Sequence, residues 1–316
     1  MAGAVIHDIA FPTASVGYAA GEAGQVWETT NGGSTWSLIL NLNYPYYWYG
    51  VSALDTKNIV ISGFLDSASA QEGIIRWSHD GGATWSDDIV LTGTAQNWLN
   101  RVRFRTSLQG LAMSQGPGPL TSYYTADGGQ QISDWNGAPA EGGWFGNQFS
   151  FDSNGARASG PDYCTSKHPG VSWKCVHSID QVFDGAVFFA SKRAGWVAGG
   201  EIAPSVAGWV HRTTDGGKTW SSRTLNAPFP IRELRFITPN VGWAAGGNVF
   251  SNIGGAYFSA DGGQSWKADL DSQGHELASC AAIKVPGGTR VWCAGFALQN
   301  SRFNSAVYST LYKKAR

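Results

Sequence analysis

One short motif recurs along the sequence, and it constrains the fold more than any other feature. Five of its six copies begin with Ser or Thr, continue through Asp or Asn to a Gly-Gly pair, and end at a tryptophan, whereas the sixth, Thr165–Trp173, keeps only the Ser/Thr, one glycine and the tryptophan. The tryptophans lie 38 to 50 residues apart, and self-similarity at this period predicts a repeat architecture. The copies are Thr29–Trp36 (TTNGGSTW), Ser78–Trp85 (SHDGGATW), Thr125–Trp135, Thr165–Trp173, Thr213–Trp220 (TTDGGKTW) and Ser259–Trp266 (SADGGQSW).

The residues of the motif predict a tight hairpin turn. Asp215 can accept hydrogen bonds from the backbone amides of its own turn. Gly216 and Gly217 supply the positive φ angles that such a turn needs. Trp220 then begins the next strand, where it can bury a large apolar area between two sheets. Two copies diverge: Thr125–Trp135 reaches its tryptophan three residues late, and Thr165–Trp173 lacks the Asp.

A second signature precedes the motif and occurs seven times. It reads VGWAAG at Val241–Gly246, AGWVAG at Ala194–Gly199 and VGYAAG at Val16–Gly21, with weaker copies elsewhere. An apolar run ends shortly before it, as in Arg232–Phe236. Four short strands in about 40–50 residues form a β-propeller blade. The sequence therefore predicts an all-β, seven-bladed β-propeller with four-stranded blades.

We expect one domain over residues 1–316. The seventh repeat lacks the motif, so its blade must be short or be completed by N-terminal residues. The expected blades are residues 4–43, 44–93, 94–140, 141–179, 180–226, 227–271 and 272–316.

Composition excludes several functions. The formal net charge of −1 argues against nucleic-acid binding, which needs a basic surface. No segment approaches 18 consecutive apolar residues, so no membrane span is expected. The six histidines lack the close paired spacing of a zinc site, and there is no calcium loop, P-loop or nucleophile elbow. We expect no metal and no cofactor, and a monomer.

The four cysteines fall into two local pairs. Cys164 and Cys175 flank the degenerate fourth motif, and Cys280 and Cys293 lie in the first two strands of the last repeat. Three pairings are formally possible, but the local one places each bridge across one hairpin. Two disulfides favour an extracellular or otherwise exported protein. No signal peptide is visible at the N-terminus.

The Ser/Thr-x-Asp-x-Gly-x-Thr-Trp pattern resembles the Asp-box (BNR) repeat. That repeat occurs in sialidases, family 74 xyloglucanases, sortilins and photosystem II assembly and stability factors, and the paired GWAAG and DGGKTW signatures look most like the last group. The resemblance covers nearly the whole chain and implies a propeller. It also implies that Asp80, Asp127, Asp215 and Asp261 belong to structural turns at the blade periphery. The sialidase Phe/Tyr-Arg-Ile-Pro motif is absent; Pro228–Glu233 (PFPIRE) has the wrong order.

A propeller binds ligands where its inner strands begin, at the mouth of the central channel. Aligning the inner strands predicts a polar ring there, with aromatic and charged residues just outside it. The ring comprises His7 and Asp8, Tyr49 and Gly50, Asn100 and Arg101, Asn147 and Gln148, Gly185 and Ala186, Arg232 and Glu233, and Ser279 and Cys280. Just outside lie Trp48, Trp98, Trp144, Phe183, Asp184, His275 and Glu276.

These residues suit a polysaccharide or oligosaccharide. Aromatic rings stack on sugars, amides bind hydroxyls, and Arg101 and Arg232 can grip a uronate carboxylate. The substrate-binding candidates are Trp48, Tyr49, Trp98, Asn100, Arg101, Trp144, Asn147, Gln148, Asp184 and Arg232.

Catalysis would need an acid and a base at the same place. Asp8, Glu233 and Glu276 can supply such a pair for glycosidic cleavage, and His7 or His275 can instead abstract a proton for elimination. A polar ring can also simply hydrate the channel, with Arg232 and Glu233 as a surface ion pair worth about 0–1 kcal/mol.

The most unusual segment is Leu42–Gly50 (LNYPYYWYG), expected as a loop between the first two blades. Its aromatic residues at 44–49 suit a surface that is both apolar and hydrogen-bonding. The segment is either a carbohydrate platform or protein contact, or a plug for the channel end.

Three functions remain open. The loops differ in every repeat, which favours one asymmetric site over a multivalent lectin. We therefore expect a glycoside hydrolase or polysaccharide lyase acting at the channel mouth. The alternatives are a non-catalytic lectin and a scaffold propeller similar to the photosystem II assembly factors.

Overall fold

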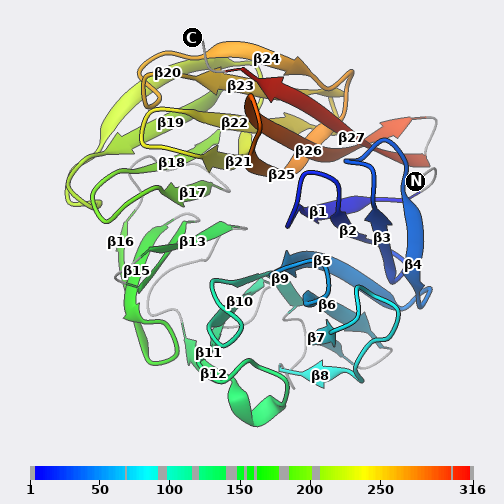
Figure 1. The fold of residues 1–316 in the computed structure, drawn as a ribbon. Coiled ribbons are helices and arrows are strands. Elements are labelled where there is room, and N and C mark those ends of the chain that lie inside the picture. The colour runs from blue at the N-terminus through cyan, green and yellow to red at the C-terminus, as the bar shows by residue number, and fades with distance from the viewer. Residues whose placement is uncertain are drawn as a thin grey trace. The chain divides into compact units, whose positions relative to one another are not determined.

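The structure is a computed structural model. It describes residues 4–67, 70–91, 98–115, 121–139, 148–152, 155–159, 162–177, 185–200, 207–299 and 302–313. These residues form seven consecutive antiparallel sheets, each built from strands adjacent in sequence (Figure 1). The fold is therefore an all-β, seven-bladed β-propeller, as the repeats predict.

The contacts of the chain group it into two compact units. Unit 1 holds the first three blades, and unit 2 holds the last four, except that residues 168–173, around the β15–β16 turn, group with unit 1. We describe each unit by itself, and a single domain over residues 1–316 stays a prediction.

The three blades of unit 1 have four strands each. A short 3₁₀ helix, η1 (Ile132–Asp134), precedes the last strand. The strands are β1 (Ile6–Ala10), β2 (Gly17–Gly21), β3 (Gln25–Thr29) and β4 (Ser37–Asn41); β5 (Tyr46–Ala53), β6 (Ile59–Asp66), β7 (Gln71–Ser78) and β8 (Ile89–Val90); and β9 (Trp98–Phe104), β10 (Gly110–Gln115), β11 (Thr121–Thr125) and β12 (Asn136–Pro139).

The last four blades have four, four, four and three strands. The strands are β13 (Gln148–Asp152), β14 (Gly155–Ser159), β15 (Asp162–His168) and β16 (Ser172–His177); β17 (Ala186–Phe189), β18 (Gly195–Gly200), β19 (Gly208–Thr213) and β20 (Ser221–Ala227); β21 (Ile231–Phe236), β22 (Gly242–Asn248), β23 (Ile253–Ser259) and β24 (Lys267–Asp271); and β25 (Glu276–Val285), β26 (Gly288–Gln299) and β27 (Arg302–Tyr312).

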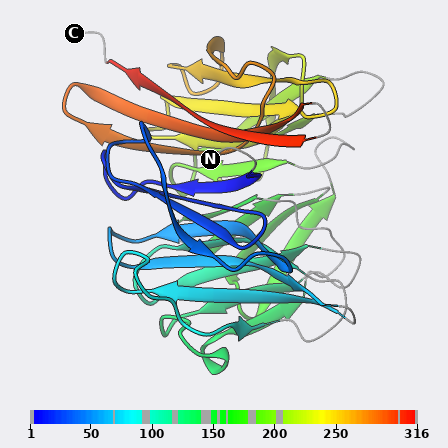
Figure 2. The same cartoon turned by 90° about the vertical axis from the view of Figure 1, so that its right-hand side faces the viewer.

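The seventh blade is short, which is one of the two possibilities that the sequence left open. Within the described residues its sheet contains only β25, β26 and β27. The long strands β26 and β27 pair over 11 positions, from Thr289–Tyr312 to Gln299–Arg302, and Figure 2 shows them side by side in orange and red.

The Tyr-rich segment is also not the loop that we expected. Tyr46–Ala53 is β5, the first strand of the second blade. Its side chains alternate between two environments: Tyr46 and Trp48 pack with the core of the blade, while Tyr47 stacks on Phe64. Alternation of this kind is the normal consequence of strand geometry.

The core lies between consecutive blades, because the second strand of a blade is buried on both faces. In β6, Ile59 and Ile61 pack with the first blade, whereas Val60 packs with the third. In β22, Ala244 packs with the fifth blade and Trp243 with the seventh. This two-sided burial explains why the GWAAG-type strands are apolar or small at every position.

The Asp-box turns form as the sequence predicts. Asp215 accepts hydrogen bonds from the amides of Lys218 and Thr219, both at 3.0 Å, and from the Thr219 hydroxyl at 2.6 Å. Gly216 and Gly217 have φ angles of 84° and 89°. In the third box, the three extra residues before the tryptophan form η1.

Both disulfides join the local pairs, Cys164 with Cys175 and Cys280 with Cys293. The first links β15 to β16, and the second joins residues that face each other across β25 and β26. Each bridge therefore lies within one blade, as expected.

The glycine that closes the GWAAG signature allows a close approach of backbone. A Cβ on Gly246 would lie 2.0 Å from the carbonyl oxygen of Pro230, and one on Gly21 would lie 2.1 Å from that of Val5. The same contact would occur at Gly63 and Gly295. A side chain there must push the first strand of the blade aside.

We expect Gly246→Ala to destabilise the protein by about 2–4 kcal/mol, because the clash is with backbone that has no alternative rotamer. Gly137→Ala is the matched control, since a Cβ there would meet only side-chain atoms at 3.4 Å or more. Urea denaturation of both variants measures the difference. Equal stability of the two would contradict the steric explanation.

The Asp-box carboxylates make stability sensitive to acid. Hydrogen bonds from the hydroxyl and amide of Thr84 lower the pKa of Asp80 to about 2. Burial alone would raise the pKa of Asp261, but hydrogen bonds from Ser265 and Ser259 outweigh it and lower the pKa to about 2. A carboxyl group whose pKa is lower in the folded than in the unfolded state stabilises the fold at pH values above its unfolded pKa of about 3.9.

The free energy of unfolding should therefore fall as the pH drops from about 4 to about 2. A triple variant that combines Asp80→Asn, Asp215→Asn and Asp261→Asn should show a weaker dependence on pH. The natural Asn31 of the first box makes the same turn, accepting from the Thr35 amide at 2.9 Å. Asn31→Asp should consequently steepen the dependence. Thermal melts from pH 2 to pH 6 test both variants, and unchanged slopes would refute the assignment.

Candidate functional site

Among the described residues, a β-bulge recurs near the start of the inner strand in five blades. The pairing register of the inner strand shifts by one residue at each of these places. A bulge re-aims side chains at the edge of a sheet. The extra residues are His7, Tyr49, Asn100, Arg232 and Ala278.

The bulges coincide with the ring that sequence alignment predicts. Four of the five extra residues belong to it, and the residues after them, such as Asp8 and Glu233, are buried. In the seventh blade the alignment is wrong by one position, because Ala278 is the extra residue and Ser279 the buried one. The whole ring stays a prediction, since its strands divide between the two units.

In unit 1, Asp8 is the centre of a buried charge cluster. Arg103 donates to both of its carboxylate oxygens, from Nη1 at 2.6 Å and Nη2 at 3.0 Å, and Arg101 Nη1 lies at 3.5 Å. The amides of Ile9 and Val51 donate to the same carboxylate at 3.0 and 2.8 Å. Asp8 has no exposed surface. Because Asp8 lies on β1, Val51 on β5 and both arginines on β9, the cluster joins the inner strands of three blades.

In unit 2, the predicted catalytic carboxylates are also held in ion pairs. Arg232 Nε lies 3.2 Å from Glu276 Oε1, and Arg235 Nε lies 3.2 Å from Glu233 Oε1. The structure thus pairs Arg232 with Glu276 and Arg235 with Glu233, and a surface pair of Arg232 with Glu233 stays a prediction. Glu276 also accepts from the amide of Val249 at 2.9 Å.

His275 lies beside this cluster and has neighbours of its own. Its Nδ1 is 2.9 Å from the hydroxyl of Tyr308, which also donates to the carbonyl of Ser272 at 2.7 Å. These contacts tie the turn before β25 to the outer strand β27. They give His275 a structural partner on the strand that closes the blade.

The geometry of these groups suits structure better than acid–base catalysis. A general acid or base must reach the substrate within hydrogen-bond distance. Asp8 and Glu233 are almost completely buried, and each is already bonded to an arginine. Asp8 joins strands of three blades through its bonds to Val51 and Arg103, whereas Glu233 pairs with Arg235 of its own strand, β21.

A continuous group of aromatic rings lies in unit 1 and reaches the surface of the protein. His7 stacks on Tyr49 with ring centroids 4.0 Å apart, and Tyr47 stacks on Phe64 at 4.7 Å. Phe64 also contacts Tyr49 at 5.7 Å and Trp98 at 5.4 Å. We call this group the aromatic patch; it comprises His7, Tyr44, Tyr47, Tyr49, Phe64 and Trp98.

The patch is graded from a buried centre to an exposed edge. Phe64 is buried, whereas Tyr44 is 68% exposed and meets Tyr47 edge-on at 6.2 Å. Trp48 is not part of it: its side chain is fully buried in the core between the first two blades. The ring of Trp48 is therefore not available to a sugar.

Acidic residues border the patch. Glu22 Oε1 lies 3.5 Å from His7 Nε2. Burial raises the pKa of Tyr49 to about 12, and the charge of Glu22 adds to the effect. Burial, Glu22 and Asp66 likewise raise the pKa of Tyr47. Both hydroxyls are therefore protonated hydrogen-bond donors at neutral pH, next to negative charge.

Several predicted residues cannot be placed. Trp144, Asn147 and Asp184 lie outside the described residues. Gln148 begins β13, and its side chain is outside the description. Asn100 is buried at its bulge, beside the buried Arg101.

Sequence reasoning missed two important residues. Arg103 lies two positions after Arg101, and residues two apart in a strand share a face of the sheet. Strand alternation could therefore have shown that both guanidinium groups lie on one face. Phe64 follows the closing glycine of the second blade, and only its cross-strand pairing with Tyr47 brings it into the patch. The first residue had a signal in the sequence, whereas the second needed the register.

In the described ranges, no group of three His, Cys, Asp or Glu side chains is placed to hold a metal ion. Among the same residues, no helix has the length and apolarity of a membrane span.

Comparison with known proteins identifies the repeat. The BNR/Asp-box repeat model matches residues 257–268, the turn of the sixth blade. The chain is an Asp-box repeat propeller. No curated protein matches the sequence.

Solved structures share the fold of this Asp-box propeller. YCF48 bound to D1 peptide is 20% identical with a TM-score of 0.66, covering 97% of this chain and 94% of that one. YCF48 from Cyanidioschyzon merolae is 18% identical with a TM-score of 0.65, covering 98% and 96%. The WD40 propeller domain of Doa1 is 10% identical with a TM-score of 0.65, covering 96% of this chain and 93% of that one. At these identities the likeness shows the fold alone.

We expect Asp8→Ala to lower the free energy of unfolding by about 3–5 kcal/mol, because it leaves buried arginine charge without its carboxylate. Asp87→Ala is the control, since Asp87 is exposed and its loss should change little. Urea denaturation measures both. A stable Asp8→Ala protein that loses activity on a polysaccharide would instead assign Asp8 to catalysis.

Proposed function

We propose that this propeller binds a polypeptide partner through the aromatic patch and acts as a scaffold or assembly factor rather than as an enzyme. The observation that carries the proposal is the patch itself: six aromatic side chains from β1, β6, β9 and the Tyr44–Tyr49 segment meet at one place in unit 1. Tyrosine and tryptophan are the residues that dominate binding at protein interfaces.

The acidic border indicates the chemistry of the partner. Aromatic faces attract cations as well as apolar groups, and Glu22 and Asp66 add negative charge beside the tyrosines. A segment that combines apolar with Lys or Arg side chains suits such a surface. The fold-level likeness to YCF48, one of whose structures contains a bound D1 peptide, supports a peptide ligand.

Glycan binding is the second candidate, and the same rings favour it, because tyrosine and tryptophan faces also stack on sugars. Cleavage of a glycan has less support, since Asp8, Glu233 and Glu276 are all engaged in ion pairs. The two disulfides favour an oxidising compartment, so we place the protein outside the reducing cytosol. We further propose that it works as a monomer.

The test is to select binders from a random peptide library and to compare variants of the protein. Tyr47→Ala and Trp98→Ala should each weaken the selected peptides by at least about 10-fold, as expected for interface hot spots. Phe250→Ala is the matched control, because Phe250 is 82% exposed and lies in unit 2. Near-UV circular dichroism checks that each variant is folded.

The same proteins are then assayed against neutral and uronate-containing polysaccharides. Glycan binding that depends on Tyr47 and Trp98, without any selected peptide, would favour the second candidate. Release of reducing ends or of unsaturated uronates by the wild-type protein would overturn the non-enzymatic proposal. Peptides that bind all variants equally would show that the patch is not the binding surface.

A further inference from the structure

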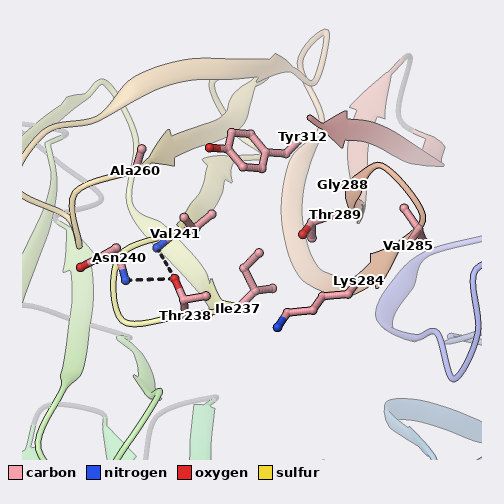
Figure 3. Close-up of a pocket in the computed structure, with 10 residues that line it drawn as sticks. All are labelled: Ile237, Thr238, Asn240, Val241, Ala260, Lys284, Val285, Gly288, Thr289 and Tyr312. Carbon is pink, nitrogen blue, oxygen red and sulfur yellow. Dashed lines mark hydrogen bonds between the residues drawn. The ribbon is translucent and has the colours of Figure 1, made fainter. Parts of the chain in front are cut away.

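A pocket in unit 2 has a lining that does not define one class of ligand. It has a volume of about 630 Å³ and lies between the β21–β22 turn and the β25–β26 hairpin (Figure 3). Its charged side chain, Lys284, is exposed. The hydroxyl of Thr238 accepts hydrogen bonds from the amides of Asn240 and Val241 at 3.2 and 3.0 Å, so it serves the turn. The aromatic patch of unit 1 is more specific, because charge lies beside its rings.

The strand β5 carries a tyrosine on each face, and on one face an arginine already lies over the ring. The guanidinium carbon of Arg76 is 5.5 Å from the ring centroid of Tyr46. Asp88 holds it there, because Asp88 Oδ1 lies 2.5 Å from Arg76 Nε and the Tyr46 hydroxyl donates to Asp88 Oδ2 at 3.0 Å. A tyrosine ring, a carboxylate and an arginine thus form one compact group within the second blade.

The opposite face of β5 brings a tyrosine and carboxylates together in the aromatic patch. Tyr47 pairs with Phe64 across β5 and β6 and stacks on its ring. Asp66 comes two positions after Phe64, so it lies on the same face of the sheet. Burial is the first cause that raises the pKa of Tyr47, and the charges of Glu22 and Asp66 add to it. Two carboxylates therefore lie beside this ring.

Within the described residues, neither of these carboxylates has an arginine or lysine partner. Glu22 Oε1 lies 3.5 Å from His7 Nε2, and the Glu22 side chain is 36% exposed. Asp66 accepts a hydrogen bond from Gln71 Nε2 at 3.1 Å. Because a carboxylate offers about four acceptor positions, both groups can bind a further donor.

We propose, on the basis of the polypeptide-binding function proposed above, that the partner presents an arginine to this part of the aromatic patch. Its guanidinium group lies against the ring of Tyr47, and its N–H groups point to Glu22 and Asp66. The contact between the two chains then has the same chemistry as the contact that Arg76 makes within the second blade.

Two physical features favour arginine over other side chains. A planar guanidinium group stacks on an aromatic face and presents five N–H donors in a fixed geometry, whereas the ammonium group of lysine is a compact, strongly hydrated charge. Apolar residues beside the arginine find aromatic surface next to it. Phe64 and Trp98 contact each other at 5.4 Å, and Tyr44 is 68% exposed at the edge of the patch.

The probes are three capped pentapeptides with leucine on both sides of one variable position, which is arginine, lysine or the neutral analogue citrulline. Isothermal titration calorimetry measures their binding at pH 8, where histidine side chains are mostly neutral, so that His7 competes least for Glu22. We expect the arginine peptide to bind at least about 5-fold more tightly than the citrulline peptide, from a cation–π contact and an exposed ion pair together. It should also bind more tightly than the lysine peptide.

Two variants test the carboxylates. Glu22→Gln and Asp66→Asn should each reduce the preference for arginine over citrulline by about 2- to 3-fold, the strength of an exposed ion pair, and should leave the affinity for the citrulline peptide nearly unchanged. Asp87→Asn is the matched control, because it removes the same charge from an exposed position of unit 1 and should change neither affinity. This comparison isolates the coupling between each carboxylate and the guanidinium group.

Two results would overturn the assignment of arginine. The first is that the wild-type protein binds the arginine peptide no better than the citrulline peptide, or binds neither at millimolar concentration. The second is that the preference for arginine is unchanged in both Glu22→Gln and Asp66→Asn.

The random peptide library separates this failure from a failure of the proposed function. Selected peptides that depend on Tyr47 and Trp98, but bind equally well with citrulline in place of arginine, would keep the patch as the binding surface and remove arginine as its ligand. A library that yields no peptide bound through the patch would remove both proposals.

Discussion

Packing between consecutive blades is the interaction on which the rest of this structure depends. A single blade has two apolar faces and cannot bury either by itself, as is general for repeat folds. The strand β22 illustrates this, because Ala244 packs toward the fifth blade and Trp243 toward the seventh. The stack of Trp196 on Phe236 is the most complete form of this packing. At the junction of the sixth and seventh blades, Trp243 instead packs with Phe258 and Tyr312.

The inner strands carry a second constraint, which combines a backbone bulge with buried charge. The closing glycine of the GWAAG signature lets a carbonyl oxygen near the start of the first strand lie close to the second strand. The bulge in the first strand then directs one side chain outward and the next one into the core. At the first blade these two side chains are His7 and Asp8. Asp8 is bound to Arg103, and His7 is stacked on Tyr49. Buried ion pairs of this kind hold strands in register at a desolvation cost, while the outward residues are free to differ between repeats.

This division changes how the functional residues are understood. The carboxylates that looked catalytic in the sequence are paired with arginines. In unit 1, the accessible rings belong to the aromatic patch. Trp48 and Tyr49 are neighbours in sequence, yet one is core and the other lies in the aromatic patch. A surface of tyrosine and tryptophan with an acidic border suits the binding of a partner. Carboxylates that are paired with arginines are less suited to proton transfer.

Local sequence patterns determined most of the fold. The Asp-box spacing predicted the repeats, the Gly-Gly pairs predicted their turns, the GWAAG signature predicted seven blades, and the cysteine spacing predicted both disulfides, because each of these features forms between residues close in the chain. The candidate site depended on contacts that the spacing does not encode. Asp8 and Arg103 are 95 positions apart, and the pairing of Tyr47 with Phe64 depends on the strand register.

The tertiary structure alone decided which side chains face outward. A shift of one residue in a strand moves every side chain to the other face, and the bulges introduce such a shift in five blades. The sequence shows that Tyr and Trp cluster at positions 44–49. Only the packing of the strands shows that Trp48 is buried and that Tyr47 and Tyr49 meet Phe64. The physical reason is that burial is a property of neighbouring blades, whereas turns and disulfides are properties of one hairpin.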